Sequence, residues 1–323
     1  MKKLIFVIVI LTMMLSLVSF NASADDGKLT VEEAIKILQS VNPNIANYDI
    51  RTHLVTFKDG SKPVYVTPKG EHPQNGEVTW DYFVEQKGDL RGWLKLPFEE
   101  IIKEKVRIVK EFEERNGIID SGSGNLTQTT SLPDSKYVSI TQYPQECSNW
   151  CGPAATKSVL SGWGINKTQS EIATREGVPC GANYGASENA IASALSYYTG
   201  TTFYGVTHFY NQQEFWNIFL ADIGSSGRAF VGEGYTDYLY DWRNHKDPTR
   251  VHYTAPRGYW TPTDSTPVES DWQKAQVAYV DPAANSTAVG YTDIHPYVSE
   301  EFIDKNGDGY DYYDYNYPFP TIA

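Results

Sequence analysis

The segment that begins at Cys151 constrains the fold of this chain more than any other feature. Cys151 and Gly152 precede Pro153, and a run of good helix formers follows up to Leu160. Proline is tolerated in the first turn of a helix because its missing N–H would have had no partner there. A helix that starts at Cys151 directs its unpaired N–H groups and the positive end of its dipole at the sulfur, which favours the thiolate. Since the thiolate is the form that attacks carbonyls, the segment predicts a nucleophile at a helix start.

Gln145 stands six residues before Cys151, and the pattern of Gln, five residues and Cys-Gly-Pro-Ala resembles the papain-like cysteine peptidases. The likeness is closest to their bacteriocin-processing, or double-glycine, branch. In that family the glutamine side chain and the backbone N–H of the nucleophile form the oxyanion hole, so the resemblance gives these roles to Gln145 and Cys151. Each donor of an oxyanion hole is worth about 3 kcal/mol. Gln142 lies nine residues upstream of Cys151 and departs from the family's spacing.

The resemblance also implies a catalytic base, which the family supplies as a histidine at the start of an apolar strand. His252 opens the segment His-Tyr-Thr-Ala, and Asp281 ends a short apolar strand before a proline. Cys151, His252 and Asp281 then follow one another in the family's order. In these roles His252 accepts the thiol proton and Asp281 orients the imidazole ring. Among the six histidines, His295 is the alternative base.

The cysteine count bears on which thiol is free. Three cysteines leave one unpaired if the other two form a disulfide. Papain-like enzymes often link a cysteine just before the nucleophile to the loop that follows, and by that resemblance Cys147 pairs with Cys180 and leaves Cys151 free. The alternative is that Cys151 is a structural thiol or one half of a disulfide.

The N-terminal residues have the pattern of an export signal. Residues 1–24 combine a basic start, an apolar stretch from Leu4 to Phe20 and Ala-Ser-Ala before a predicted cleavage after Ala24. We therefore expect a secreted or extracellular protein, with cell-surface association as an option and no stable membrane span after cleavage. Cleavage removes two lysines and no acid, so the net charge changes from −13 to −15. A protein this negative repels nucleic acid, which excludes it as a partner.

The rest of the chain divides into a small N-terminal module and a catalytic module. Residues 25–117 contain a capping box, a hairpin signal and an amphipathic helix, which predict a small α/β unit, and the Ser- and Gly-rich residues 118–135 predict a linker. Residues 136–300 are helical first and strand-rich second, the papain-like order. The predicted fold class is α+β, with the active-site cleft between a helical half and an antiparallel β-sheet half. The small module suggests a zymogen whose propeptide is cut within the linker, and a permanent accessory domain is the alternative.

The acidic tail, residues 301–323, matches the first positions of an EF-hand-type calcium loop. Oxygen ligands at alternate positions and a glycine at position six suit Ca²⁺. Position twelve, however, is Tyr315 instead of Glu. A structural Ca²⁺ is therefore one hypothesis and a solvated acidic turn the other, while catalysis needs no cofactor. The candidate ligands are Asp304, Asn306, Asp308 and Tyr310.

Three functions are compatible with this sequence. The first is a secreted cysteine peptidase that hydrolyses a peptide or protein substrate through a Cys-His-Asp triad and a thioester acyl-enzyme. The second is another thiol acyl transferase on the same fold, such as a transglutaminase or amidase. The third is a catalytically inactive domain that binds peptides or cell-surface material. The resemblance favours the first, because transglutaminase-like chains lack a glutamine at this spacing.

Overall fold

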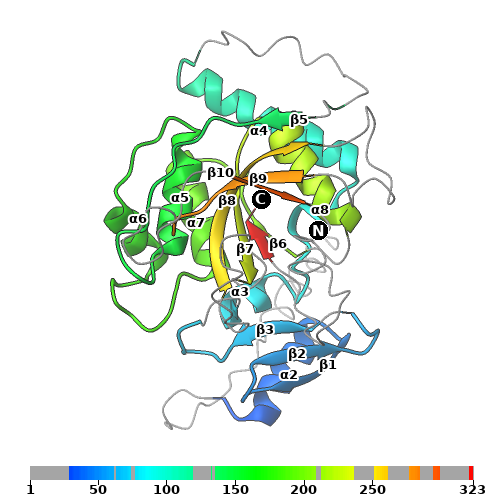
Figure 1. The fold of residues 1–323 in the computed structure, drawn as a ribbon. Helices are drawn as coiled ribbons and strands as arrows, with labels where there is room; N and C mark the ends of the chain where they lie inside the picture. Colours follow the sequence, from blue (N-terminus) through cyan, green and yellow to red (C-terminus); the bar gives the residue numbers. More distant parts are fainter. Residues whose placement is uncertain are drawn as a thin grey trace, which may run out of the picture.

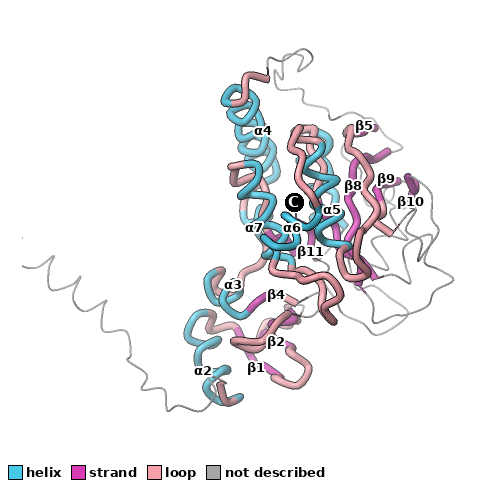
Figure 2. The backbone as a smooth tube through the Cα atoms, turned by 90° about the vertical axis from the view of Figure 1, so that its left-hand side faces the viewer, coloured by secondary structure: helices cyan, strands magenta, loops and turns pink. Residues whose placement is uncertain are grey.

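The computed structural model describes residues 29–61, 63–73, 77–118, 132, 135–208, 212–235, 251–260, 276–283, 294–298 and 320–322. They form a helical half and a β-sheet half that lie side by side, with a small module at one end (Figure 1 and Figure 2). This is the α+β architecture that the sequence predicts. Within the described ranges, no helix is both long and apolar enough to cross a membrane.

The small module has a hydrophobic core of its own, which includes Leu38 and Val55. The predicted capping box starts its first helix: the Glu33 N–H donates to the Thr30 hydroxyl, and the Glu33 carboxylate accepts from the Thr30 N–H at 2.9 Å. Its sheet has the order β1-β2-β3-β4 and is antiparallel except between β3 and β4. The elements are α2 (Val31–Val41), β1 (Ile45–Asp49), β2 (Leu54–Phe57), β3 (Val64–Thr67), β4 (Val78–Thr79) and α3 (Trp80–Glu85).

The helical half lies on one side of the large sheet, as Figure 2 shows for α4, α5, α6 and α7. Thr168 begins α6 through a second capping box, and Gly177 and Gly200 end α6 and α7 in the left-handed conformation that glycine adopts without strain. The helices are η1 (Gly92–Lys95), α4 (Phe98–Arg115), α5 (Cys151–Ser161), α6 (Gln169–Glu176), α7 (Glu188–Thr199) and α8 (Gln212–Phe219), and α8 continues into the π-helical turn η2 (Leu220–Ser225).

The large sheet has the strand order β10-β9-β8-β7-β11-β6, all antiparallel, and β5 pairs with the end of β8. Its central strand β8 contains a proline, which cannot donate to the ladder. The strand accommodates it at a bulge between Pro256 and Gly258. In Figure 1, β8 starts near the small module and runs away from it. The strands are β5 (Ser135–Tyr137), β6 (Val206–His208), β7 (Val231–Tyr235), β8 (Val251–Trp260), β9 (Gln276–Val280), β10 (Ile294–Val298) and β11 (Pro320–Ile322).

Helix α4 packs in the core of the larger unit and not in that of the small module. Phe112 on α4 contacts Trp163 edge to face, with ring centroids 4.7 Å apart. Lys105, also on α4, forms an ion pair with Asp222 of η2 at 2.6 Å, and neither side chain has any exposed surface. The two cores therefore meet near Leu90, the last residue of the small core, whereas the division by sequence groups α4 with the small module.

Candidate active site

Cys151 is the first residue of α5, as the sequence predicts, and is 7% exposed. The turn before it is held by side chains that bond to the loop after α6. The Trp150 indole N–H donates to the carbonyl of Val178 at 3.0 Å, and the Asn149 amide donates to the carbonyl of Tyr184 at 3.0 Å. The sulfur therefore lies at a helix N-terminus whose entry is fixed, where the positive end of the dipole favours a negative charge.

Gly152 is a position where a side chain does not fit. A Cβ added there would lie 2.9 Å from the Cβ of Ala186 and 3.1 Å from Cδ1 of Ile191. Real Cβ atoms essentially never make contacts shorter than 3.0 Å, and these two neighbours are themselves buried. The glycine after Cys151 thus lets α5 pack closely against the loop before α7 and against α7 itself.

His252 and Asp281 meet at one end of the large sheet. His252 is the second residue of β8, and Asp281 directly follows β9, the neighbouring strand. Nε2 of His252 lies 2.6 Å from Oδ1 of Asp281, and both residues are buried. The same Oδ1 accepts the N–H of Ala283 at 2.7 Å, which fixes the carboxylate. The Gln142 amide donates to the backbone carbonyl of Asp281 at 3.0 Å.

The surroundings of His252 favour its protonated form. Burial by itself lowers the pKa of His252, but the charge and hydrogen bond of Asp281 and a hydrogen bond with Cys151 together raise that pKa to about 10. An imidazole with this pKa is protonated at neutral pH and can hold a thiolate beside it. Because Nε2 bonds to Asp281, Nδ1 is the ring nitrogen that can serve the sulfur.

Gln145 links the loop before Cys151 to the strand end that carries Asp281. Its backbone N–H donates to the carbonyl of Pro282 at 2.8 Å. Its side-chain Nε2 donates to the carbonyls of Cys147 and Ser148 at 3.0 and 3.1 Å. The predicted role of Gln145 in an oxyanion hole therefore requires Nε2 to release one of these carbonyls and to donate to a substrate oxygen instead.

The disulfide Cys147–Cys180 is formed, as the resemblance implies, and Cys151 is a free buried cysteine. The bridge joins the loop before α5 to the loop after α6 across a sequence separation of 33 residues. These are the same two loops that Asn149 connects by hydrogen bonds. The loop before Cys151 and the loop after α6 are therefore held together by a covalent bond as well as by hydrogen bonds.

Glu176 is a buried acid near Cys151 that the sequence does not single out. Its Oε1 accepts the hydroxyl of Thr156 at 2.8 Å, and its Oε2 lies next to Gly152 without a hydrogen-bond partner. No motif marks this glutamate, and a charged residue at a helix end is ordinarily exposed. Only the packing of α5 against α6 reveals it.

Other predicted features lie outside the described residues. These are the export signal, most of the linker and the calcium loop with Asp304, Asn306, Asp308 and Tyr310, so the signal and the Ca²⁺ site stay predictions. The backbone of His295 pairs with Tyr279 in the sheet, and its side chain is not described. Within the part of the chain that the structure describes, no group of three or more His, Cys, Asp and Glu side chains could hold a metal ion.

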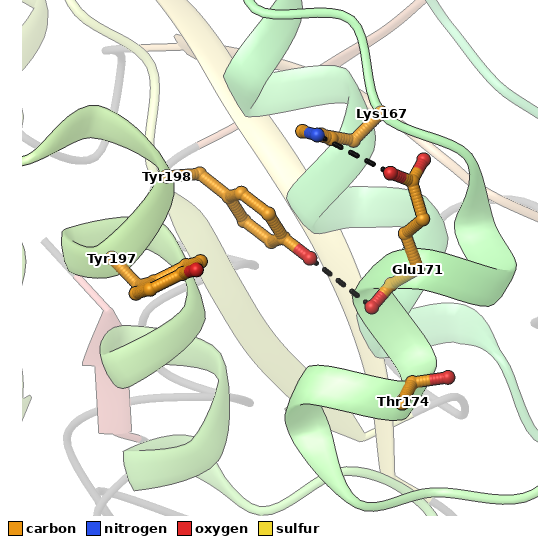
Figure 3. A pocket seen from close by; sticks show the side chains of 5 residues that line it. All are labelled: Lys167, Glu171, Thr174, Tyr197 and Tyr198. Atoms are coloured by element: carbon orange, nitrogen blue, oxygen red, sulfur yellow. Dashed lines mark hydrogen bonds and ion pairs between the residues drawn. The ribbon is translucent and has the colours of Figure 1, made fainter.

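A surface hollow lies between α6 and α7 (Figure 3). The hydroxyl of Tyr198 donates to the carbonyl of Glu171 at 3.1 Å, and Lys167 pairs with the Glu171 carboxylate at 3.2 Å. These contacts join the two helices and support the capping box that starts α6. The residues of the hollow therefore have a role in holding the fold together. Its lining residues are Lys167, Glu171, Thr174, Tyr197 and Tyr198.

A comparison with protein-family models agrees with the resemblance. A family model described as the Peptidase_C39-like family matches residues 136–305, more than half of the chain. Among solved structures, the peptidase domain of Streptococcus ComA, a bi-functional ABC transporter involved in a quorum-sensing pathway, is 14% identical with a TM-score of 0.34. That match covers 58% of this chain and 96% of the ComA domain. A search of curated proteins finds no match.

Proposed function

The chain belongs to the Peptidase_C39-like family, and on this basis we propose that it is a cysteine peptidase that hydrolyses peptide bonds in a peptide or protein substrate. The observation that carries the proposal is that Cys151, the first residue of α5, interacts with His252, and that His252 is hydrogen-bonded to Asp281. A nucleophile, a base and a group that orients the base are the three parts that acyl transfer from a peptide requires.

The reaction proceeds in two steps. The Cys151 thiolate attacks the scissile carbonyl carbon, a C–S bond forms, and the carbonyl electrons move onto oxygen. When the tetrahedral intermediate collapses, the C–N bond breaks, and the imidazolium of His252 gives its proton to the leaving amine. In the second step His252 takes a proton from water, the resulting hydroxide attacks the thioester, and the acid product leaves as the thiolate re-forms. Asp281 holds the imidazole through both steps.

The oxyanion of each tetrahedral intermediate needs hydrogen-bond donors. The backbone N–H of Cys151 belongs to the first turn of α5, where helix geometry provides no partner. Gln145 supplies the second donor once its Nε2 releases a loop carbonyl. Its backbone bond to Pro282 holds the residue near Asp281, which supports this role.

Export and restraint by the small module are part of the proposal. The signal pattern of residues 1–24 and a disulfide, which persists mainly in oxidising compartments, support secretion. His72 of the small module stacks on Tyr184, with ring centroids 4.7 Å apart and planes 7° apart. Tyr184 belongs to the loop that Asn149 ties to the nucleophile. A module in contact with this loop can hinder a substrate that approaches Cys151, which supports the zymogen hypothesis.

Alkylation by iodoacetamide under non-reducing conditions tests the proposed nucleophile. Because Cys147 and Cys180 form a disulfide, Cys151 is the thiol open to the reagent. We expect Cys151 at pH 7 to react faster than glutathione, and His252→Ala to slow it to the rate of an ordinary thiol or below. Mass spectrometry of the digested protein assigns the label, and Cys151→Ser is the control for labelling elsewhere.

A peptide library then tests the reaction itself. We expect the wild-type chain to cleave some of its members and Cys151→Ala to cleave none. Fast alkylation that depends on His252, with transfer of acyl groups to added amines but no hydrolysis, would instead support the acyl-transferase alternative. If Cys151 reacts no faster than glutathione, the chain lacks an activated thiolate and the catalytic proposal is wrong.

A further inference from the structure

Glu176 is a buried acid that the proposed mechanism does not use. It is the last residue of α6 and only 6% exposed, and its side chain points at the first turn of α5. Oε1 is held by the hydroxyl of Thr156 at 2.8 Å. Oε2 has no hydrogen-bond partner and would lie 3.5 Å from a Cβ built on Gly152, the residue after the nucleophile.

Among the residues that the structure describes, no cation contributes to the electrostatics of the Glu176 carboxylate. Around Gly152, the other side chains that approach are those of Ala186 and Ile191, and both are apolar. The neighbour on its own helix, Arg175, lies over the ring of Tyr197, at 4.2 Å from its centroid. The titratable side chain that faces Glu176 from α5 is Cys151, whose negative charge opposes ionisation of the glutamate. His252 approaches Cys151 from β8 and is already paired with Asp281.

We propose that Glu176 is a positioning residue for the nucleophile, acting as an uncharged acid that fills the space behind the start of α5 and leaves the thiolate of Cys151 unopposed. When it ionises, it adds a second negative charge behind the sulfur and shifts the pair from thiolate and imidazolium toward neutral thiol and imidazole. The proposal rests on the proposed function, because it requires a thiolate at Cys151. It defines an upper pH limit for activity that is set by Glu176 and not by His252.

The electrostatics of Glu176 support this assignment. Burial raises the pKa of Glu176, the hydrogen bond from Thr156 lowers it, and the charge of Cys151 raises it again, so that the pKa reaches about 8. The acid is therefore neutral at pH 7 and ionises at a lower pH than His252, whose pKa is about 10. By reciprocity, the thiolate that raises the pKa of Glu176 is destabilised to the same extent when Glu176 ionises.

The experiment measures the alkylation rate of Cys151 by iodoacetamide from pH 6 to 9.5 on the full chain. In the wild type we expect the rate to fall by about threefold or more, as a buried like charge requires, with a midpoint near pH 8. Glu176→Gln keeps the shape but cannot ionise, so its rate is expected to stay level across this range. Thr156→Val removes the hydrogen bond that lowers the pKa of Glu176, so the midpoint is expected to move to higher pH.

The two variants keep the test decisive if one of them folds poorly. A merely structural role of Glu176 would change the rate equally at every pH, and identical pH profiles in the wild type and Glu176→Gln would overturn the proposal while leaving the proposed nucleophile intact. An unshifted midpoint in Thr156→Val would also contradict it. A Cys151 that reacts no faster than glutathione at any pH would overturn the proposed function, and with it the role of Glu176.

Discussion

Replacing Lys105 by methionine tests whether α4 is an integral part of the proposed catalytic unit, the larger unit whose core contains Cys151. Nζ of Lys105 lies 2.6 Å from Oδ1 of Asp222, and neither side chain has exposed surface. Nζ also lies 4.8 Å from the ring centroid of Trp93 and 4.2 Å from that of Phe203. Lys105→Met keeps most of the apolar stem among these rings but leaves the buried carboxylate of Asp222 without its cation.

The expected loss of stability is large. Removing one partner of a buried ion pair costs about 3–5 kcal/mol, a substantial part of the roughly 5–15 kcal/mol that stabilises a typical domain. Burial already raises the pKa of Asp222 from 3.8 to about 6 although Lys105 lowers it, so without the lysine that pKa rises further. The variant is then most stable below about pH 4 and loses stability as the pH rises through the folded-state value. The difference in the free energy of unfolding between the variant and the wild type is therefore smaller at pH 5 than at pH 8.

Urea unfolding followed by tryptophan fluorescence at pH 5 and pH 8 measures both effects. Lys110→Met, at an exposed position of the same helix, is the matched control and is expected to change the free energy of unfolding by less than about 0.5 kcal/mol. Lys105→Met combined with Asp222→Leu removes both charges and should recover most of the loss. If Lys105→Met is no less stable than Lys110→Met, α4 does not depend on this pair and the reasoning is refuted.

Three further results are expected. Gly152→Ala should lower the unfolding midpoint and slow alkylation of the nucleophile, because its Cβ would lie 2.9 Å from that of Ala186; a normal midpoint and rate would contradict this packing. Replacing Cys147 and Cys180 together by serine should cost about 3–4 kcal/mol in urea unfolding, from a loop closed over 33 residues, and the difference from the wild type should vanish once both are reduced. Burial raises the pKa of Glu188, a hydrogen bond with Glu233 lowers it and the charge of Glu77 raises it again, from 4.5 to about 8 in all. The contribution of Glu188 to stability is therefore greatest below pH 4.5 and falls as the pH rises toward 8. Glu188→Gln should therefore lose less stability than the wild type between pH 5 and pH 8, and equal losses would speak against a buried ionising acid.

The parts that the sequence predicts well are those with a local signal. Thr30 and Thr168 are followed three residues later by Glu33 and Glu171, and both capping boxes form where this spacing predicts them. The helix start at Cys151 also lies where its neighbours Gly152 and Pro153 predict it, although no side chain caps this helix. Local chemistry at a helix end is fixed by residues within one turn, so a single sequence is enough to find it.

The parts that the sequence could not predict depend on residues far apart in the chain. β11 inserts between β6 and β7, although more than eighty residues separate it from β7, and no turn signal specifies this pairing. Lys105 occupies what looks like the charged face of α4, yet it is fully buried because Asp222, 117 positions later, lies opposite. Glu176 is hidden for the same reason. Burial of a charged side chain is decided by which element packs against it, and that information is not in the local pattern.

The packing of α4 determines whether proteolytic cleavage of the linker can release the small module. Glu113 pairs with Arg228 at 2.7 Å, and Arg115 donates to the carbonyl of Thr199 at 3.1 Å, so the end of α4 next to the linker is bound to the catalytic unit, as Lys105 binds its first half. A cut within residues 118–135 therefore leaves α4 in place and, with it, the attached small module.

Release of the small module requires a second cut between the small core and α4, in the segment that η1 occupies. The Trp93 indole N–H in that segment donates to the carbonyl of Phe203 at 2.9 Å, which protects it from a protease. We therefore expect limited proteolysis to cut the linker first and to leave a complex of two fragments that co-elute in gel filtration. If the N-terminal fragment separates under native conditions, α4 is not integral to the catalytic unit, and a propeptide that extends to residue 117 becomes the better description.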